Sequence, residues 1–141
     1  MKKSIQFFAC LFLFASIVQA QQYSQKSCSA VTLNRTIEFD GSSESENIII
    51  DVSEDTGKMH VGINSTIKSG FLTVELYDPK GNKKGNFSIE SQQNSNNKKK
   101  ELVCGQMQKY IDDPVKGKWV ILLTPNKVKG EVSICTSMYD E

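Results

Sequence analysis

The sequence predicts an all-β protein, a single antiparallel β-sandwich of the jelly-roll type with eight or nine short strands. Apolar residues recur at every second position in short bursts, and Gly, Pro, Asn and Asp fall between the bursts. No long stretch shows the 3.6-residue spacing of an amphipathic helix. A chain of 141 residues is about one domain long. A closed barrel is the alternative architecture.

The first 20 residues have the pattern of a cleaved secretory signal. Two lysines precede an apolar, Phe-rich stretch over 5–18, and Val-Gln-Ala precedes the expected cut after Ala20. The stretch is about fourteen residues long, shorter than the roughly 20 that span a bilayer. We therefore expect a signal peptide over 1–20, a polar segment over 21–30 and a sandwich domain over 31–138. The mature protein is then secreted or periplasmic and has no transmembrane span.

The first strands are predicted by alternation and β-branching. Residues 31–39 alternate apolar side chains with Thr, Asn and Glu, and residues 47–52 hold three consecutive isoleucines, a run too short for a helix. Residues 59–63 and 71–77 alternate again, which places His60 on the solvent face of its strand.

The later strands are separated by strong turn signals. Asp78-Pro79-Lys80-Gly81-Asn82 is a turn, because Pro presets φ and Gly accepts a positive φ. Residues 92–100 are polar and predict a mobile loop. The expected strands of this half are 87–89, 101–107, 119–124 and 131–138, with a loop at 112–117 and a turn at 125–130. The run at 119–124 is almost continuously apolar, which indicates a central strand with Trp119 in the core.

Three segments resemble a known module. Leu72–Gly81 reads Leu-Thr-Val-Glu-Leu-Tyr-Asp-Pro-Lys-Gly, Gly117–Ile121 reads Gly-Lys-Trp-Val-Ile, and Gly130–Ile134 reads Gly-Glu-Val-Ser-Ile. This order resembles the bacterial pre-peptidase C-terminal domain and, more loosely, the P domain of proprotein convertases, over roughly Glu38 to Thr136. The resemblance implies a jelly-roll accessory module of secreted proteins that contributes no catalytic residues.

Charge and composition exclude several classes of function. Lys and Arg number 17 against 16 Asp and Glu, and removal of Lys2 and Lys3 with the leader gives 15 − 16 = −1. This balance excludes a basic nucleic-acid binder. A single His argues against multi-His metal sites and His-based triads, so we expect no enzyme, cofactor or metal. The clustered carboxylates, expected to be solvated loop charge, are Glu44, Glu46, Asp51, Glu54, Asp55, Asp112 and Asp113. A Ca²⁺ loop is the alternative for them.

Three cysteines follow the leader, so at most one internal disulfide can form. They are Cys28, Cys104 and Cys135. In many sandwiches the first and last strands are antiparallel neighbours, which favours a Cys28–Cys135 pair. A Cys104–Cys135 pair and the absence of any disulfide are the alternatives.

The candidate binding residues are two tyrosines and three lysines: Tyr77, Tyr110, Lys80, Lys83 and Lys84. The tyrosines are the better candidates for an exposed aromatic ring, and the lysines share a hairpin tip that could contact an anionic glycan or a membrane surface. Together the patterns predict an exported, monomeric, non-enzymatic accessory or binding protein that contacts a protein or envelope partner. A carbohydrate-binding module with an exposed aromatic is the alternative, followed by a small hydrolase with two converging carboxylates.

Overall fold

The computed structural model describes residues 30–92 and 101–140, in which all regular structure is β-strand. The predicted signal peptide, the polar segment up to residue 29, Cys28 and residues 93–100 of the predicted loop lie outside the described residues. Among the residues described, no helix is long and apolar enough to cross a bilayer. The prediction of an all-β antiparallel protein is confirmed.

Within the described residues the sheet has six strands, rather than the eight or nine predicted. They are β1 (Ala30–Ser42), β2 (Glu46–Val52), β3 (Thr56–Tyr77), β4 (Lys83–Ser91), β5 (Val103–Asp112) and β6 (Gly117–Asp140). The runs expected at 59–63 and 71–77 are both parts of β3, and those at 119–124 and 131–138 are both parts of β6. The count is lower because two strands continue through stretches whose sequences resemble turns.

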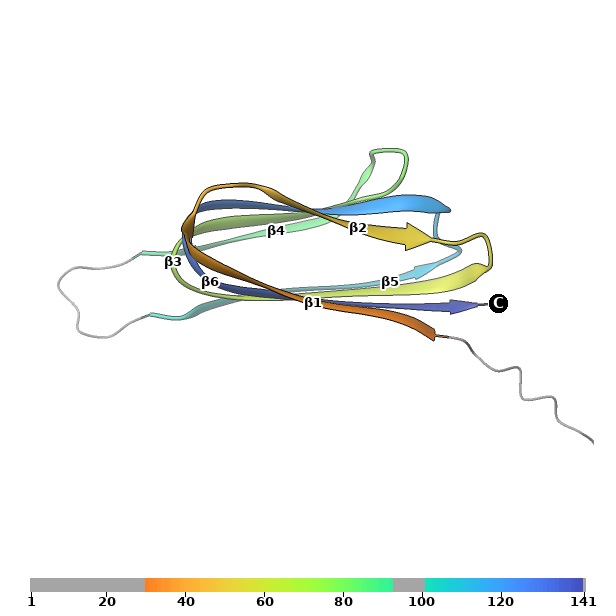
Figure 1. Ribbon diagram of the computed structural model, residues 1–141, viewed down its shortest axis with the longest axis horizontal. Coiled ribbons are helices and arrows are strands. Elements are labelled where there is room, and N and C mark those ends of the chain that lie inside the picture. The colour runs from red at the N-terminus through yellow and green to blue at the C-terminus, as the bar shows by residue number, and fades with distance from the viewer. Residues whose placement is uncertain (1–29, 93–100, 141) are drawn as a thin grey trace, which may run out of the picture.

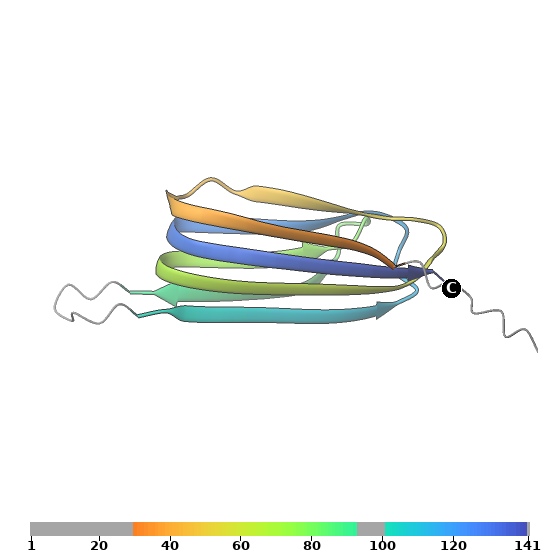
Figure 2. The same ribbon diagram turned by 60° about the horizontal axis from the view of Figure 1, so that its bottom comes forward.

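The two long strands arrange the sheet as two facing layers (Figure 1). In what we call the first layer, β1 pairs with the second half of β6, which pairs with the first half of β3, which pairs with β5. In the second layer the order is β2, the first half of β6, the second half of β3, and β4. Figure 2 shows the first layer face on, with β1 and β5 at its edges.

The long strands bend where they pass between the layers, and glycines permit the bend. The β3–β6 register shifts between Ile67 and Phe71, as at a β-bulge. Gly130 has a φ of 155°, and a Cβ there would lie 2.2 Å from the backbone oxygen of Thr66. Gly70 has a φ of 88°, and its Cβ would lie 2.5 Å from the backbone oxygen of Lys127. Any larger residue would push β3 and β6 apart at this corner.

The core lies between the layers and is formed by alternate residues of every strand. Trp119 is 1% exposed, as predicted, and its Nε1 donates a hydrogen bond to the backbone oxygen of Val115 at 2.8 Å. Each fully buried aliphatic side chain contributes about 1.5 to 3 kcal/mol to folding. Thr136 is also fully buried, and its hydroxyl has no hydrogen-bond partner within the described residues. Burying that hydroxyl without a partner lowers the stability of the fold.

Candidate functional site

An aromatic pair stands on the outer face of the first layer. Tyr110 on β5 lies directly opposite His60 on β3, and their rings stack with centroids 4.4 Å apart and planes 22° apart. Tyr110 remains 81% exposed, the largest exposure among the exposed large hydrophobic residues of the described chain. His60 faces solvent, as the alternation predicted. The stack therefore presents a ring to solvent in a fixed orientation.

Gln108 fixes the His60 side of this pair. Its Oε1 lies 2.7 Å from Nε2 of His60, which is hydrogen-bond distance. Gln108 lies opposite Gly62 in the register of β3 and β5. A Cβ on Gly62 would lie 2.9 Å from Oε1 and 3.2 Å from Nε2 of Gln108, closer than side chains normally approach. The glycine thus leaves the space in which the Gln108 amide lies across β3 and reaches His60.

Small uncharged polar side chains surround the pair on the same face. Ser137 on β6 lies opposite His60, and Thr32 on β1 lies opposite Ser137. Further along the face, the residues that share it are Asn34, Cys135, Gln106, Asn64, Thr36 and Ser133. Because the side chains are short and the strands are regular, the face is a surface of hydroxyl and amide groups.

Part of the outer face of the second layer is apolar. Ile49 on β2 is 52% exposed and lies opposite Val120 on β6, which in turn lies opposite Tyr77 on β3. Leu122, two residues along β6, extends this group on the same face. We call these four residues the apolar patch. Tyr77 and Tyr110 therefore lie on opposite layers, and the structure does not bring the two predicted aromatic candidates together.

Two of the three candidate lysines are neutralised by carboxylates of their own hairpin. Lys83 forms an ion pair with Glu75, and its Nζ lies 5.8 Å from the centre of the Tyr77 ring. The hydrogen bond between them lowers the pKa of Glu75 and raises the pKa of Lys83. Lys84 pairs with Asp78 at 3.2 Å. The hairpin tip is therefore less cationic than the three lysines in the sequence suggest.

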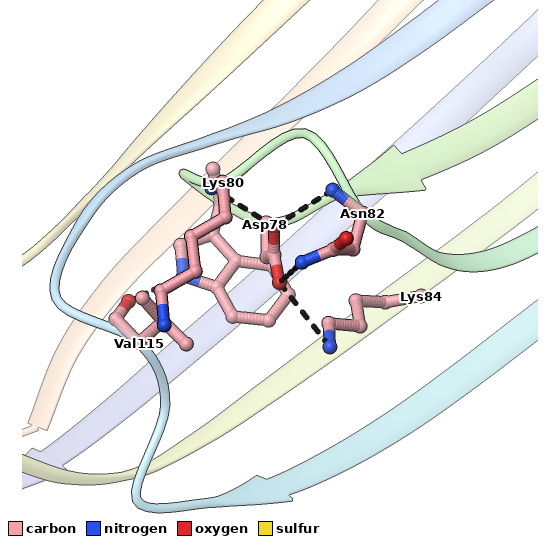
Figure 3. Close-up of polar contacts among 6 residues, drawn as sticks. Asp78, Lys80, Asn82, Lys84 and Val115 are labelled. Carbon is pink, nitrogen blue, oxygen red and sulfur yellow. Dashed lines mark hydrogen bonds and ion pairs between the residues drawn. The ribbon is translucent and has the colours of Figure 1, made fainter.

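Asp78 organises the turn between β3 and β4 (Figure 3). Its buried carboxylate accepts hydrogen bonds from the backbone nitrogens of Lys80 at 2.9 Å and Asn82 at 2.8 Å, and from Nδ2 of Asn82 at 3.0 Å. Burial raises the pKa of Asp78, but the bonds from Asn82, the Lys84 ammonium and the Lys80 amide outweigh it and lower the pKa to about 2. The sequence predicts the turn, but it does not predict that the Asp78 carboxylate is buried and accepts these hydrogen bonds. The spacing of Asp78 and Asn82, four residues apart around Pro and Gly, is the sequence feature that could have indicated it.

Carboxylates from three segments meet at one end of the sheet. Glu54 and Asp55 follow β2, Asp112 and Asp113 lie where β5 ends, and Asp140 ends β6. They line two open depressions of about 330 and about 600 Å³. All five are exposed, and the described residues contain no group of three or more His, Cys, Asp or Glu placed to hold a metal ion. Their exposure matches the solvated loop charge that the sequence predicted.

The remaining predicted carboxylates lie elsewhere. Glu46 pairs with Arg35 across the gap between β1 and β2, with their side-chain atoms 3.6 Å apart. Asp51 projects from the outer face of β2 beside Lys118 of β6, and Glu44 lies in the connection between β1 and β2. The predicted acidic group is thus divided between distant parts of the sheet.

The cysteines form no disulfide within the described residues, where Cys104 and Cys135 are both free thiols. The predicted antiparallel pairing of the first and last strands is confirmed, but the residue opposite Cys135 is Asn34. The alternative pair Cys104–Cys135 is excluded by geometry. The β3 strand separates them, and their partners on it, Thr66 and Gly62, are four residues apart. That offset places their Cα atoms about 16 Å apart, whereas a disulfide allows at most about 7 Å.

Comparison with known proteins assigns no family. No family model matches the chain, and no curated protein matches it. A solved structure of Bacillus endospore appendages, described as a novel family of disulfide-linked pili, is similar over 80% of this chain and 88% of its own. The sequence identity is 8% and the TM-score is 0.43, values at which the likeness assigns neither family nor function. The resemblance to the pre-peptidase C-terminal domain remains a prediction from the sequence.

Proposed function

We propose that this protein is an exported, monomeric, non-enzymatic binding module with a jelly-roll-like sandwich fold. It engages a partner protein of the cell envelope or its surroundings by strand addition at the edge of β2. Export rests on the predicted signal peptide. The observation that supports the binding mode is the contrast between β2 and the other three edge strands.

Edge strands normally carry features that prevent further pairing. On β1, Arg35 occupies an inward position, and the register with β6 shifts between Asp40 and Ser42. On β4, two lysines begin the strand and the register with β3 shifts at Tyr77. On β5, Lys109 occupies an inward position between two hydrophobic residues.

The β2 edge lacks these features. Its register with β6 is regular from Glu46 to Val52, and the inward residues Ile48, Ile50 and Val52 are buried and apolar. On the outward side, Ile49 is exposed next to the rest of the apolar patch. An added strand would extend the backbone hydrogen bonding of the second layer and cover Ile49 at the same time.

The edge also indicates what the partner segment contains. A residue opposite Ile49 should be apolar, because β-branched and aromatic cross-strand pairs stabilise a sheet by about 0.2 to 1 kcal/mol each. A residue opposite the exposed carboxylate of Asp51 should be Lys or Arg. The expected ligand is an extended segment of a protein, apolar at its centre and basic at one end.

A displayed library of short random peptides, panned against the chain from residue 21 onward, tests this proposal. We expect the selected peptides to alternate apolar residues and to protect the backbone amides of β2 from hydrogen exchange. Ile49→Lys should weaken their binding by about tenfold or more. Leu102→Lys is the matched control, because Leu102 is 59% exposed but lies outside the apolar patch. Failure of any peptide to enrich, protection of a different strand, or equal binding by Ile49→Lys would contradict the proposal.

A further inference from the structure

We infer that the outer face of the first layer is a binding site for a neutral oligosaccharide, centred on the stacked pair of Tyr110 and His60. This site lies on the opposite layer from the β2 edge. Sugar binding at this site does not depend on strand addition at β2.

Tyr110 exposes its aromatic ring to solvent. The residue lies on β5, an edge strand of the first layer, so no neighbouring strand covers the side of the ring that faces away from His60. One ring face is already held against His60 at 4.4 Å. The C–H-rich face of a pyranose ring packs well on an aromatic ring. Because the ring is ordered before binding, less side-chain entropy is lost when a ligand stacks on it.

An ordered polar group lies beside the ring. One end of the Gln108 amide bonds to His60 at 2.7 Å, so its other end is held in place across β3. Sugar hydroxyls both donate and accept hydrogen bonds, and a fixed amide next to an aromatic face provides the direction that a flat surface otherwise lacks. The space made by Gly62 is required for this arrangement.

The charge and shape of the face also favour a neutral oligosaccharide. The rows around the pair carry hydroxyl and amide groups, including Ser137, Thr32 and Asn64. The nearest charged row holds Lys58 opposite Asp112, one charge of each sign, at the end of the sheet where Asp113 and Asp140 also lie. The face therefore offers an anionic ligand no electrostatic attraction. A chain of neutral sugars can form hydrogen bonds with side chains on successive strands. The open face suits an extended oligosaccharide rather than an enclosed small molecule.

The test is titration of the chain from residue 21 onward with soluble cello-, xylo-, manno- and malto-oligosaccharides, followed by calorimetry and NMR. A sulfated oligosaccharide serves as the anionic comparison. We expect one neutral series to bind and to shift the resonances of Tyr110, Gln108 and their neighbours on the first layer. Raising the salt concentration should leave that binding unchanged, because no charge contributes.

Three variants separate the site from a merely structural effect. Tyr110→Ala should weaken binding by about tenfold or more, and Tyr110→Phe should retain it, because stacking needs the ring and not the hydroxyl. Gly62→Ala should also weaken binding, because its Cβ displaces Gln108 while leaving the fold intact. Leu102→Ala is the control for loss of an exposed apolar side chain outside the site. The emission of the buried Trp119 reports folding in each variant.

Defined outcomes overturn the inference. Absence of binding by every neutral series at millimolar concentration, or equal binding by Tyr110→Ala, would do so. Binding of a proline-rich peptide to Tyr110 in place of any sugar would assign the face to a protein ligand instead. Ile49→Lys should leave sugar binding unchanged and Tyr110→Ala should leave peptide binding at β2 unchanged, so failure of one proposal is distinguishable from failure of the other.

Discussion

Replacing Gly130 with alanine should be far more damaging than replacing Gly81, although both glycines have a positive φ. Gly130 lies at the corner where β6 passes between the layers, with a φ of 155°. Gly81 lies in the β3–β4 turn with a φ of 80°, and a Cβ there meets nothing within 4 Å. The comparison separates the cost of an unusual backbone conformation from the cost of a collision.

The expected magnitudes follow from these surroundings. For Gly81→Ala, the left-handed conformation costs about 1 kcal/mol, and reduced freedom of the unfolded chain returns about 0.5 kcal/mol. For Gly130→Ala, the new Cβ lies 2.2 Å from the backbone oxygen of Thr66, whereas Cβ atoms in proteins stay at least 3.0 Å from other heavy atoms. The backbones of β3 and β6 must therefore move apart, which breaks hydrogen bonds between the strands worth about 1 kcal/mol each. We expect Gly130→Ala to lower the free energy of unfolding by about 4 kcal/mol in total.

Urea unfolding followed by tryptophan emission measures both variants. Trp119 is the only tryptophan and is 1% exposed, so its emission reports exposure of the core. Since domains of this size are stable by about 5 to 15 kcal/mol, Gly130→Ala should unfold at much lower urea or fail to fold, while Gly81→Ala stays close to the parent. Equal unfolding midpoints for the two variants would refute the assignment of the bend to Gly130.

Three further predictions concern single side chains. The pKa of Asp78 is lowered from 3.8 to about 2 in the folded chain, so its ionised form stabilises the fold above pH 3.8 and that stability is lost as the pH falls toward 2. Asp78→Asn should be less stable at neutral pH and should lose this part of the acid dependence of the urea midpoint. Thr136→Val should raise stability by about 1 kcal/mol in the same assay, because it removes a buried hydroxyl without a partner and keeps the shape; a loss of stability would show that the hydroxyl is satisfied. A neutral thiol reagent should label the exposed Cys104 before the partly buried Cys135, as read by mass spectrometry of the digested protein, and equal rates would contradict the exposures described.

Short-range patterns predict part of the core. The apolar run over 119–124 predicts the burial of Trp119, and alternation predicts the outward position of His60. The run of three isoleucines does not distinguish the buried Ile48 and Ile50 from the exposed Ile49. The continuity of β6 did not follow, because residues 125–130 contain Pro, Asn and Gly and resemble a turn when taken alone. Pairing with β3 keeps the strand continuous through these residues. A short stretch of sequence does not show which distant segment it will pair with, so the continuity could not be predicted.

The aromatic pair shows the same limit. The sequence predicts an exposed Tyr110 ring and a solvent-facing His60, but no local pattern indicates that the two side chains are in contact. Their contact depends on the register of β3 with β5, and the expected strand ended at residue 107, before Tyr110. The alternation of inward Met107 and Ile111 with outward Gln108 and Tyr110 was the signal that the strand continues. The same dependence on register explains why Asn34, and not a cysteine, lies opposite Cys135.

The position of β6 has a consequence for the order in which the chain acquires its structure. The strand is synthesised after the other five and is the direct partner of β1, β2 and β3. Until it leaves the ribosome, β1 and β2 have no neighbour among the described strands, and β3 can pair only with β4 and β5. Folding must therefore wait for the whole domain, and closing contacts between such distant segments is slow. The core between the two layers can therefore close only after the last described strand has been synthesised.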